Sequence, residues 1–215
     1  MKNKPGLIFL WINMLMLWFA LVLQFIISTG MYRSEGRSFF GALVQILSFY
    51  TIQTNLLIAI ALTAILFAPG SRWGSFFGRA SVLTAIAVYI LIVGLVYATV
   101  LKGIWQLHGL FKLTDVLLHE VSPLSFLLFW VLFVPKEKLE WNLLLSWAIF
   151  PLLYLVYSLA RGASTGYYPY PFLNAAKFGY AQVMINSAGV LVVFLILSSF
   201  LIGVSRLVNR GNGAV

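Results

Sequence analysis

The sequence predicts an all-α fold, a polytopic membrane bundle of six transmembrane helices, and three observations predict it. Hydrophobic residues make up 62% of the 215 residues and charged residues only 9%, whereas soluble domains contain roughly 25% charged residues. Mean hydropathy is +0.99. Six stretches are long and apolar enough to cross about 30 Å of hydrocarbon, which takes around 20 residues in a helix. No soluble core hides so much apolar surface.

The six stretches follow one another along the chain, at residues 7–27, 47–67, 82–101, 115–134, 141–159 and 180–204. The first resembles a signal peptide, but its length and the lack of an A-x-A cleavage site favour a retained span. All six are apolar around most of their circumference, as helices in a bundle are. Short connections rich in Gly, Ser, Pro and charge separate them. We therefore predict one domain, a six-helix transmembrane domain over residues 1–215.

Composition also excludes several kinds of site. The chain has no Cys, so disulfides and thiolate ligands are excluded, and two His and five acidic residues leave little for a metal. We expect no metal and no cofactor. The net charge of +9 is scattered among the connections instead of forming a stripe with aromatic residues, as nucleic-acid binders have. We therefore expect membrane lipids as partners, and no nucleic acid.

The distribution of Lys and Arg favours cytoplasmic termini. The ends and even-numbered connections carry eight of them, at Lys2, Lys4, Arg72, Arg79, Lys136, Lys138, Arg206 and Arg210. The odd-numbered connections carry six, at Arg33, Arg37, Lys102, Lys112, Arg161 and Lys177. Cytoplasmic loops carry the excess of positive charge. We predict a multi-pass protein of the cell membrane with both termini in the cytoplasm.

Polar residues open the second, fourth and sixth stretches. These clusters are Thr51, Gln53, Thr54 and Asn55; Asp115, His119, Glu120 and Ser122; and Gln182, Asn186 and Ser187. Polar groups inside a span cost several kcal/mol unless they face the bundle interior. Because even-numbered spans enter from the same side, we expect the three clusters at one depth. The connections on that side hold Trp105, His108 and Tyr170, so one end of the bundle is polar and aromatic.

These residue types suffice for a hydrolase. Thr51 supplies a nucleophilic hydroxyl, His119 a base and Asp115 a carboxylate that orients the base. Thr54 or Asn55 is a candidate donor to an oxyanion. The remaining substrate-binding candidates, at the same end, are Asn186, Tyr170 and Arg161. Arg161 or Lys177 is suited to a lipid carboxylate.

Each residue also has a structural interpretation. A Thr in a membrane helix bonds the carbonyl four residues back, His119 holds two helices together, and Asp115 is solvated or paired with Lys112. Trp105 and the tyrosines anchor the protein at the interface. Pro123 removes the donor to the His119 carbonyl, which predicts a bend.

The pattern resembles the bacterial Pr6Pr family of membrane proteins and, more distantly, the androgen-induced family of eukaryotes. The matching segments are Phe49-Tyr50-Thr51, the stretch from Leu118-His119 to Pro123, and Tyr170-Pro171-Phe172-Leu173. The eukaryotic resemblance implies hydrolysis of fatty acid esters of hydroxy fatty acids, with Thr51 as nucleophile and His119 as base. The residues after Thr51 and the spacing to Pro123 depart from that pattern.

Three hypotheses follow for the function. The first is a hydrolase of lipid or fatty-acyl esters, acting on a lipid-like small molecule. The second is a transporter or proton-coupled carrier, with Asp115, His119 and Glu120 as a titratable relay; no inverted repeat accompanies it. The third is a non-catalytic structural or partner-binding protein, in which the polar residues fix helix packing.

Overall fold

The structure is a computed structural model that describes residues 4–212, so Lys2 of the charge comparison lies outside it. It confirms the all-α fold, and no strand occurs in the described range. Six helices there are long and apolar enough to cross a membrane: Lys4–Ser34, Tyr50–Phe67, Ala80–Leu101, Gly109–Phe133, Leu143–Thr165 and Ala175–Gly211. All six overlap the predicted spans, and most extend further, because helices continue past the apolar stretch into the interface.

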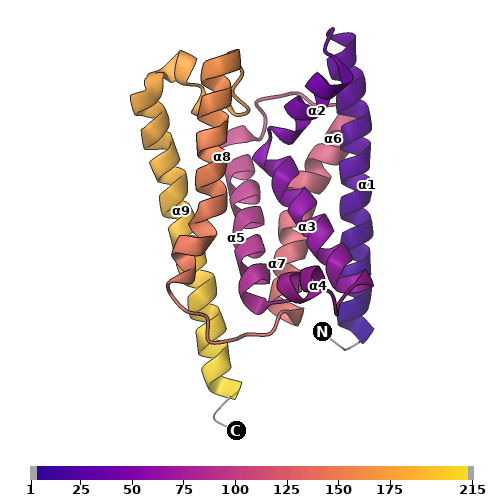
Figure 1. Ribbon diagram of the computed structural model, residues 1–215, viewed down its shortest axis with the longest axis vertical. Coiled ribbons are helices and arrows are strands. Elements are labelled where there is room, and N and C mark those ends of the chain that lie inside the picture. The colour runs from indigo at the N-terminus through magenta and orange to yellow at the C-terminus, as the bar shows by residue number, and fades with distance from the viewer. Residues whose placement is uncertain (1–3, 213–215) are drawn as a thin grey trace. The chain divides into compact units, whose positions relative to one another are not determined.

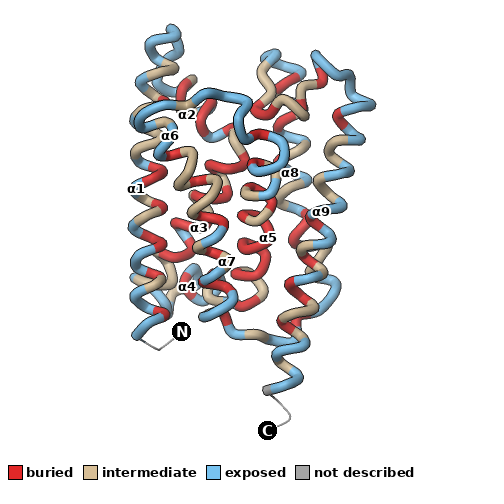
Figure 2. The backbone as a smooth tube through the Cα atoms, turned by 180° about the vertical axis from the view of Figure 1, so that it is seen from behind, coloured by how far each residue is buried: buried red, intermediate tan, exposed pale blue. Residues whose placement is uncertain are grey.

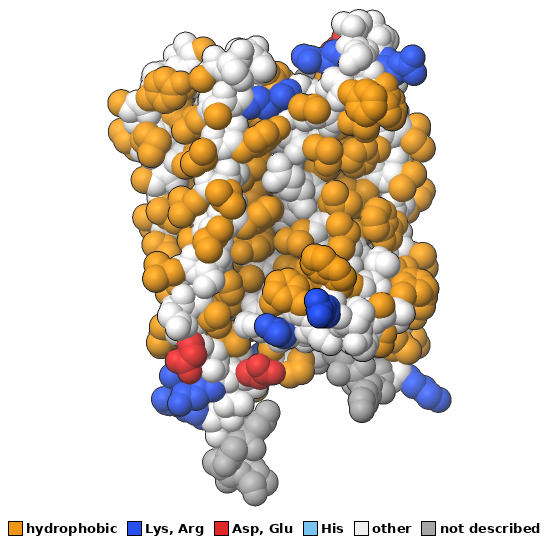
Figure 3. Space-filling view, viewed as in Figure 1, with side chains coloured by type: hydrophobic (Ala, Val, Ile, Leu, Met, Phe, Trp, Pro, Cys, Tyr) orange, Lys and Arg blue, Asp and Glu red, His pale blue; other side chains and the backbone are white. Residues whose placement is uncertain are grey.

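The chain packs as two compact units, Met1–Pro135 and Lys136–Val215, which we describe one by one. The first unit contains the first four spans and the second unit the last two (Figure 1). In each unit, hydrophobic side chains cover the middle of the face seen in Figure 3, and Lys and Arg lie toward its ends. This distribution suits a helix bundle with lipid as its solvent.

Helix α1 (Lys4–Ser34) shows how one apolar helix serves two environments. Leu10, Leu17 and Leu21 are buried, whereas Ile12 and Phe19 on other faces are exposed. Buried and exposed turns accordingly alternate along its backbone in Figure 2. In the first unit α1 packs against α2 (Phe39–Leu47), α3 (Tyr50–Phe67) and α7 (Ser122–Phe133). Its outer face is therefore suited to lipid and its inner face to the bundle.

The second predicted span begins where one helix ends and the next starts. The sequence predicts a helix over residues 47–67, whereas in the structure α2 ends at Leu47 and α3 begins at Tyr50. The Oγ of Ser48 donates to the Val44 carbonyl, and Gln53 Nε2 donates to the Leu47 carbonyl at 2.8 Å. These bonds satisfy carbonyls that the break leaves without a helical donor. Thr51 thereby lies in the first turn of α3.

The third and fourth spans each contain a π-helical turn. Helix α5 (Ala80–Val96) continues into η1 (Tyr97–Leu101), and α6 (Gly109–Val116) continues through η2 (Leu117–Val121) into α7. Where the sequence predicts a bend at Pro123, the structure has η2, which ends two residues before it. Proline has no N–H for the carbonyl four residues back, and within η2 the ladder shifts so that Ser122 N–H donates to the Leu117 carbonyl. A short interfacial helix, α4 (Arg72–Phe77), precedes α5.

The second unit is a helical hairpin of α8 (Leu143–Thr165) and α9 (Ala175–Asn212), joined through a short 3₁₀ turn, η3 (Pro171–Leu173). Helix α8 ends at Gly166, whose φ of 71° is left-handed. Gly179, with φ 74°, interrupts α9. The continuous part of α9 therefore starts at the residue where the sequence predicts the sixth span to start.

Candidate functional site

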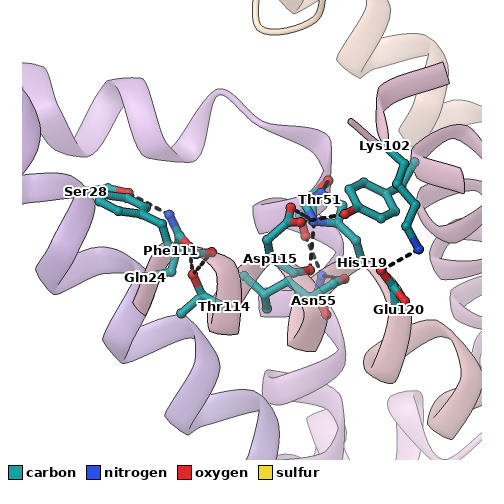
Figure 4. Close-up of polar contacts among 12 residues, drawn as sticks. Gln24, Ser28, Thr51, Asn55, Lys102, Phe111, Thr114, Asp115, His119 and Glu120 are labelled. Atoms are coloured by element: carbon teal, nitrogen blue, oxygen red, sulfur yellow. Dashed lines mark hydrogen bonds and ion pairs between the residues drawn. The ribbon is translucent and has the colours of Figure 1, made fainter. Parts of the chain in front are cut away.

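Thr51 and His119 lie in direct contact, although 68 positions separate them in the sequence. The Oγ1 of Thr51 is 3.1 Å from Nε2 of His119, and Figure 4 shows the two side chains turned toward each other. Thr51 is 5% exposed, and the His119 side chain 19%. Helix α3 positions the hydroxyl, and the π-helical turn η2 positions the imidazole. The hydrogen-bonded pair is thus mostly buried, and part of the His119 side chain remains exposed.

Asp115 completes a chain of three side chains. Its Oδ1 is 2.9 Å from Nδ1 of His119, one helical turn away on the same face. The Asp115 backbone carbonyl is 3.1 Å from the same nitrogen. Two acceptors beside Nδ1 favour the tautomer that carries its proton there, which leaves Nε2 to accept from Thr51. We call Thr51, His119 and Asp115 the triad.

Tyr97, from η1, contacts two members of the triad, Asp115 and His119. The sequence did not single it out as a candidate. Its hydroxyl donates to Oδ2 of Asp115 at 2.6 Å. Its ring stacks on the His119 ring, with centroids 4.5 Å apart and planes inclined by 16°. A tyrosine near the end of an apolar span is typical of an interface anchor. Nothing in the local sequence therefore marks Tyr97 as part of a site.

Asn55 fastens α3 to the fourth span beneath the triad. Its Nδ2 donates to the carbonyls of Thr51 and Leu118, at 2.9 and 3.1 Å, and its Oδ1 accepts from Ser122 Oγ at 2.5 Å. Asn55 and Ser122 are both buried. Both ends of the amide are thus engaged by protein groups. In this geometry Asn55 connects the two helices.

Thr54 lies on the same face of α3 and is fully buried. Its Oγ1 has no hydrogen-bond partner within residues 4–212. It therefore lacks the bond to the carbonyl four residues back that Thr63 and Thr84 make.

Two further polar contacts flank the triad in Figure 4. Lys102 Nζ is 3.0 Å from Glu120 Oε1, with side chains 57% and 35% exposed. On the other flank, Thr114 of α6 donates to Gln24 of α1, and Gln24 in turn donates to Ser28 at 2.6 Å. The first contact is an ion pair at the rim, and the second ties α1 to α6. Asp115 pairs with His119 and Tyr97, not with Lys112.

The other three candidates belong to the second unit. Asn186 Nδ2 donates to the Phe172 carbonyl at 2.9 Å, and its Oδ1 accepts from Gln182. The Tyr170 ring is buried and stacks on Phe172, with centroids 5.5 Å apart. The Arg161 guanidinium lies 5.5 Å from the centre of the Tyr167 ring. These contacts hold the connection between α8 and α9 in place. The triad lies wholly in the first unit.

The arrangement has the parts of a nucleophile activated by a general base. A hydroxyl, an imidazole and a carboxylate in a hydrogen-bonded row are the elements of nucleophilic acyl transfer. No group of three or more His, Cys, Asp or Glu side chains suited to a metal ion occurs in the described part of the chain.

Comparison with known proteins gives no family for the chain. No protein-family model matches it, and neither does any curated protein or any solved structure.

Proposed function

We propose that this multi-pass membrane protein is a hydrolase of lipid or fatty-acyl esters, with Thr51 as nucleophile, His119 as general base and Asp115 as the carboxylate that orients His119. The observation that supports the proposal is the row of contacts from Thr51 Oγ1 to His119 Nε2, at 3.1 Å, and from His119 Nδ1 to Asp115 Oδ1, at 2.9 Å. The resemblance to the androgen-induced family implies the same two roles for Thr51 and His119.

The reaction proceeds through an acyl-enzyme. Thr51 Oγ attacks the ester carbonyl carbon while its proton passes to Nε2 of His119. The tetrahedral intermediate expels the alcohol, which takes that proton and leaves an acyl ester on Thr51. Water then attacks the acyl carbon and gives a proton to His119. Thr51 recovers the proton as the carboxylic acid departs. Asp115 stabilises the imidazolium in both halves.

The substrate is a lipid because the nucleophile lies in an apolar helix. Thr51 begins an apolar span, and the exposed residues of α2, such as Phe39, Phe40 and Val44, offer an acyl chain an apolar surface. The charge bias supports cytoplasmic termini in a cell membrane. The triad, on the side opposite the termini, then faces the outer leaflet.

Covalent labelling tests the proposal. An alkyl fluorophosphonate probe added to membranes containing the full chain phosphonylates an activated hydroxyl with loss of fluoride. We expect labelling of wild type and Thr51→Ser, and none of Thr51→Val or His119→Ala. The control is Thr63→Val, about 18 Å further along α3. Labelling of Thr51→Val at the wild-type level removes Thr51 as nucleophile.

Two other results would point to the competing functions. Substrate or proton flux in liposomes that His119→Ala abolishes, in a protein that takes up no probe, indicates a carrier. Loss of thermal stability in Thr51→Val and His119→Ala, without labelling of any variant, indicates a structural polar cluster.

A further inference from the structure

Tyr97 and His119 lie face to face because each occupies a π-helical turn. Tyr97 begins η1 at the end of α5, and His119 is the middle residue of η2. A π-helical turn is rare and appears often at functional sites, since it shifts the side chains out of the α-helical register. Two such turns facing each other from different spans bring together an aromatic ring and an imidazole that regular helices would direct elsewhere.

The approach of the two spans depends on a glycine. A Cβ on Gly94 of α5 would lie 3.0 Å from Pro123 Cβ and 3.6 Å from the His119 carbonyl oxygen. A side chain at this position would require Pro123, at the start of α7, to move by a few tenths of an ångström. Gly94 thus permits the contact that Tyr97 makes one turn later.

We propose that Tyr97 is the positioning residue of the triad, an inference that rests on the proposed function. Its hydroxyl holds Asp115 Oδ2 at 2.6 Å, so that Oδ1 is directed at His119 Nδ1. Its ring lies parallel to the imidazole and limits rotation of His119 about its side-chain torsions. Both contacts keep Nε2 directed at Thr51. Tyr97 itself does not touch Thr51 and transfers no proton.

Probe kinetics separate this role from a structural one. The rate constant kinact reports attack by Thr51, and KI reports probe binding. Tyr97→Phe removes the hydroxyl and keeps the ring, so we expect kinact to fall about tenfold to a hundredfold with KI unchanged. Tyr97→Leu, which also loses the ring stack, is expected to lower kinact further. The control is Tyr89→Phe, about 12 Å earlier in α5, which is expected to leave kinact unchanged.

A double-mutant cycle tests whether Tyr97 acts through Asp115. In an Asp115→Asn background, we expect Tyr97→Phe to lower kinact by less than about threefold, because the group it orients has been altered. Because kinact is a property of each labelled molecule, reduced expression of a variant does not change it.

The outcomes distinguish this inference from the proposed function. Loss of labelling in Thr51→Val with unchanged kinact in Tyr97→Phe overturns the role of Tyr97 alone. The same fold-loss from Tyr97→Phe in both backgrounds also overturns it, since Tyr97 then acts independently of Asp115. Labelling that survives in Thr51→Val overturns the proposed function and this inference with it.

Discussion

At the scale of single residues, two buried neighbours on α3, Thr54 and Asn55, differ in whether their polar side chains are hydrogen-bonded. The Asn55 amide makes three hydrogen bonds, of which one lies within α3 and two connect α3 with η2 and α7. The Thr54 hydroxyl, equally buried, makes none within residues 4–212. A buried polar group without a partner costs about 1–3 kcal/mol, whereas a satisfied one stabilises the fold. The same sequence signal, a polar residue in a membrane helix, thus has opposite energetic meanings one position apart.

This contrast predicts opposite effects on stability. Asn55→Leu leaves Ser122 Oγ and the Leu118 carbonyl without a bond, so we expect a loss of about 2–4 kcal/mol. Thr54→Val removes an unsatisfied hydroxyl and is expected to be neutral or stabilising by up to about 1 kcal/mol. Thermal unfolding of the two variants in detergent, beside wild type, measures both effects. Equal destabilisation by the two substitutions would contradict the hydrogen-bond assignment.

At the scale of elements, the site depends on departures from regular helix. The second span is broken between α2 and α3, and η1 and η2 interrupt the third and fourth spans. The sequence predicts the distortion near Pro123, because a missing N–H is a local property. It does not predict α2, because nine residues next to an apolar run look like part of the connection or of the span. It does not predict η1, because no residue in Tyr97–Leu101 lacks an N–H or a side chain.

The close approach of α5 to the start of α7 leads to a second stability prediction. Gly94→Ala places a methyl group 3.0 Å from Pro123 Cβ, so we expect Pro123 to shift and to disturb the neighbouring turn η2, which carries His119. We expect a loss of about 1–3 kcal/mol together with slower probe labelling. The control is Gly30→Ala in α1, where nothing lies within 4 Å, and alanine is expected to stabilise the helix by about 0.5–1 kcal/mol. Unfolding midpoints and labelling rates that match wild type in Gly94→Ala would remove the steric argument.

At the scale of the whole molecule, six spans require both termini on one side of the membrane. The chain has no Cys, so single cysteines report the side directly. We expect Lys4→Cys and Arg210→Cys to react with an impermeant maleimide only after the membrane is opened, and Glu35→Cys to react in intact cells. Reaction of Lys4→Cys and Arg210→Cys from different sides would show that one of the six helices does not cross. Reaction of both in intact cells would reverse the proposed orientation.

The sequence alone determined that the chain is an all-α membrane protein with six spans, because transfer of a helix into lipid depends on its own composition and length. It also singled out Thr51, His119 and Asp115, since polar residues inside spans are rare and costly. Only the tertiary structure decided that these three side chains meet, that Asn55 is engaged elsewhere and that Tyr97 joins them. Contacts between residues 68 positions apart depend on the rotation and register of packed helices. Those are set by how side chains interlock across the bundle, which no local pattern records.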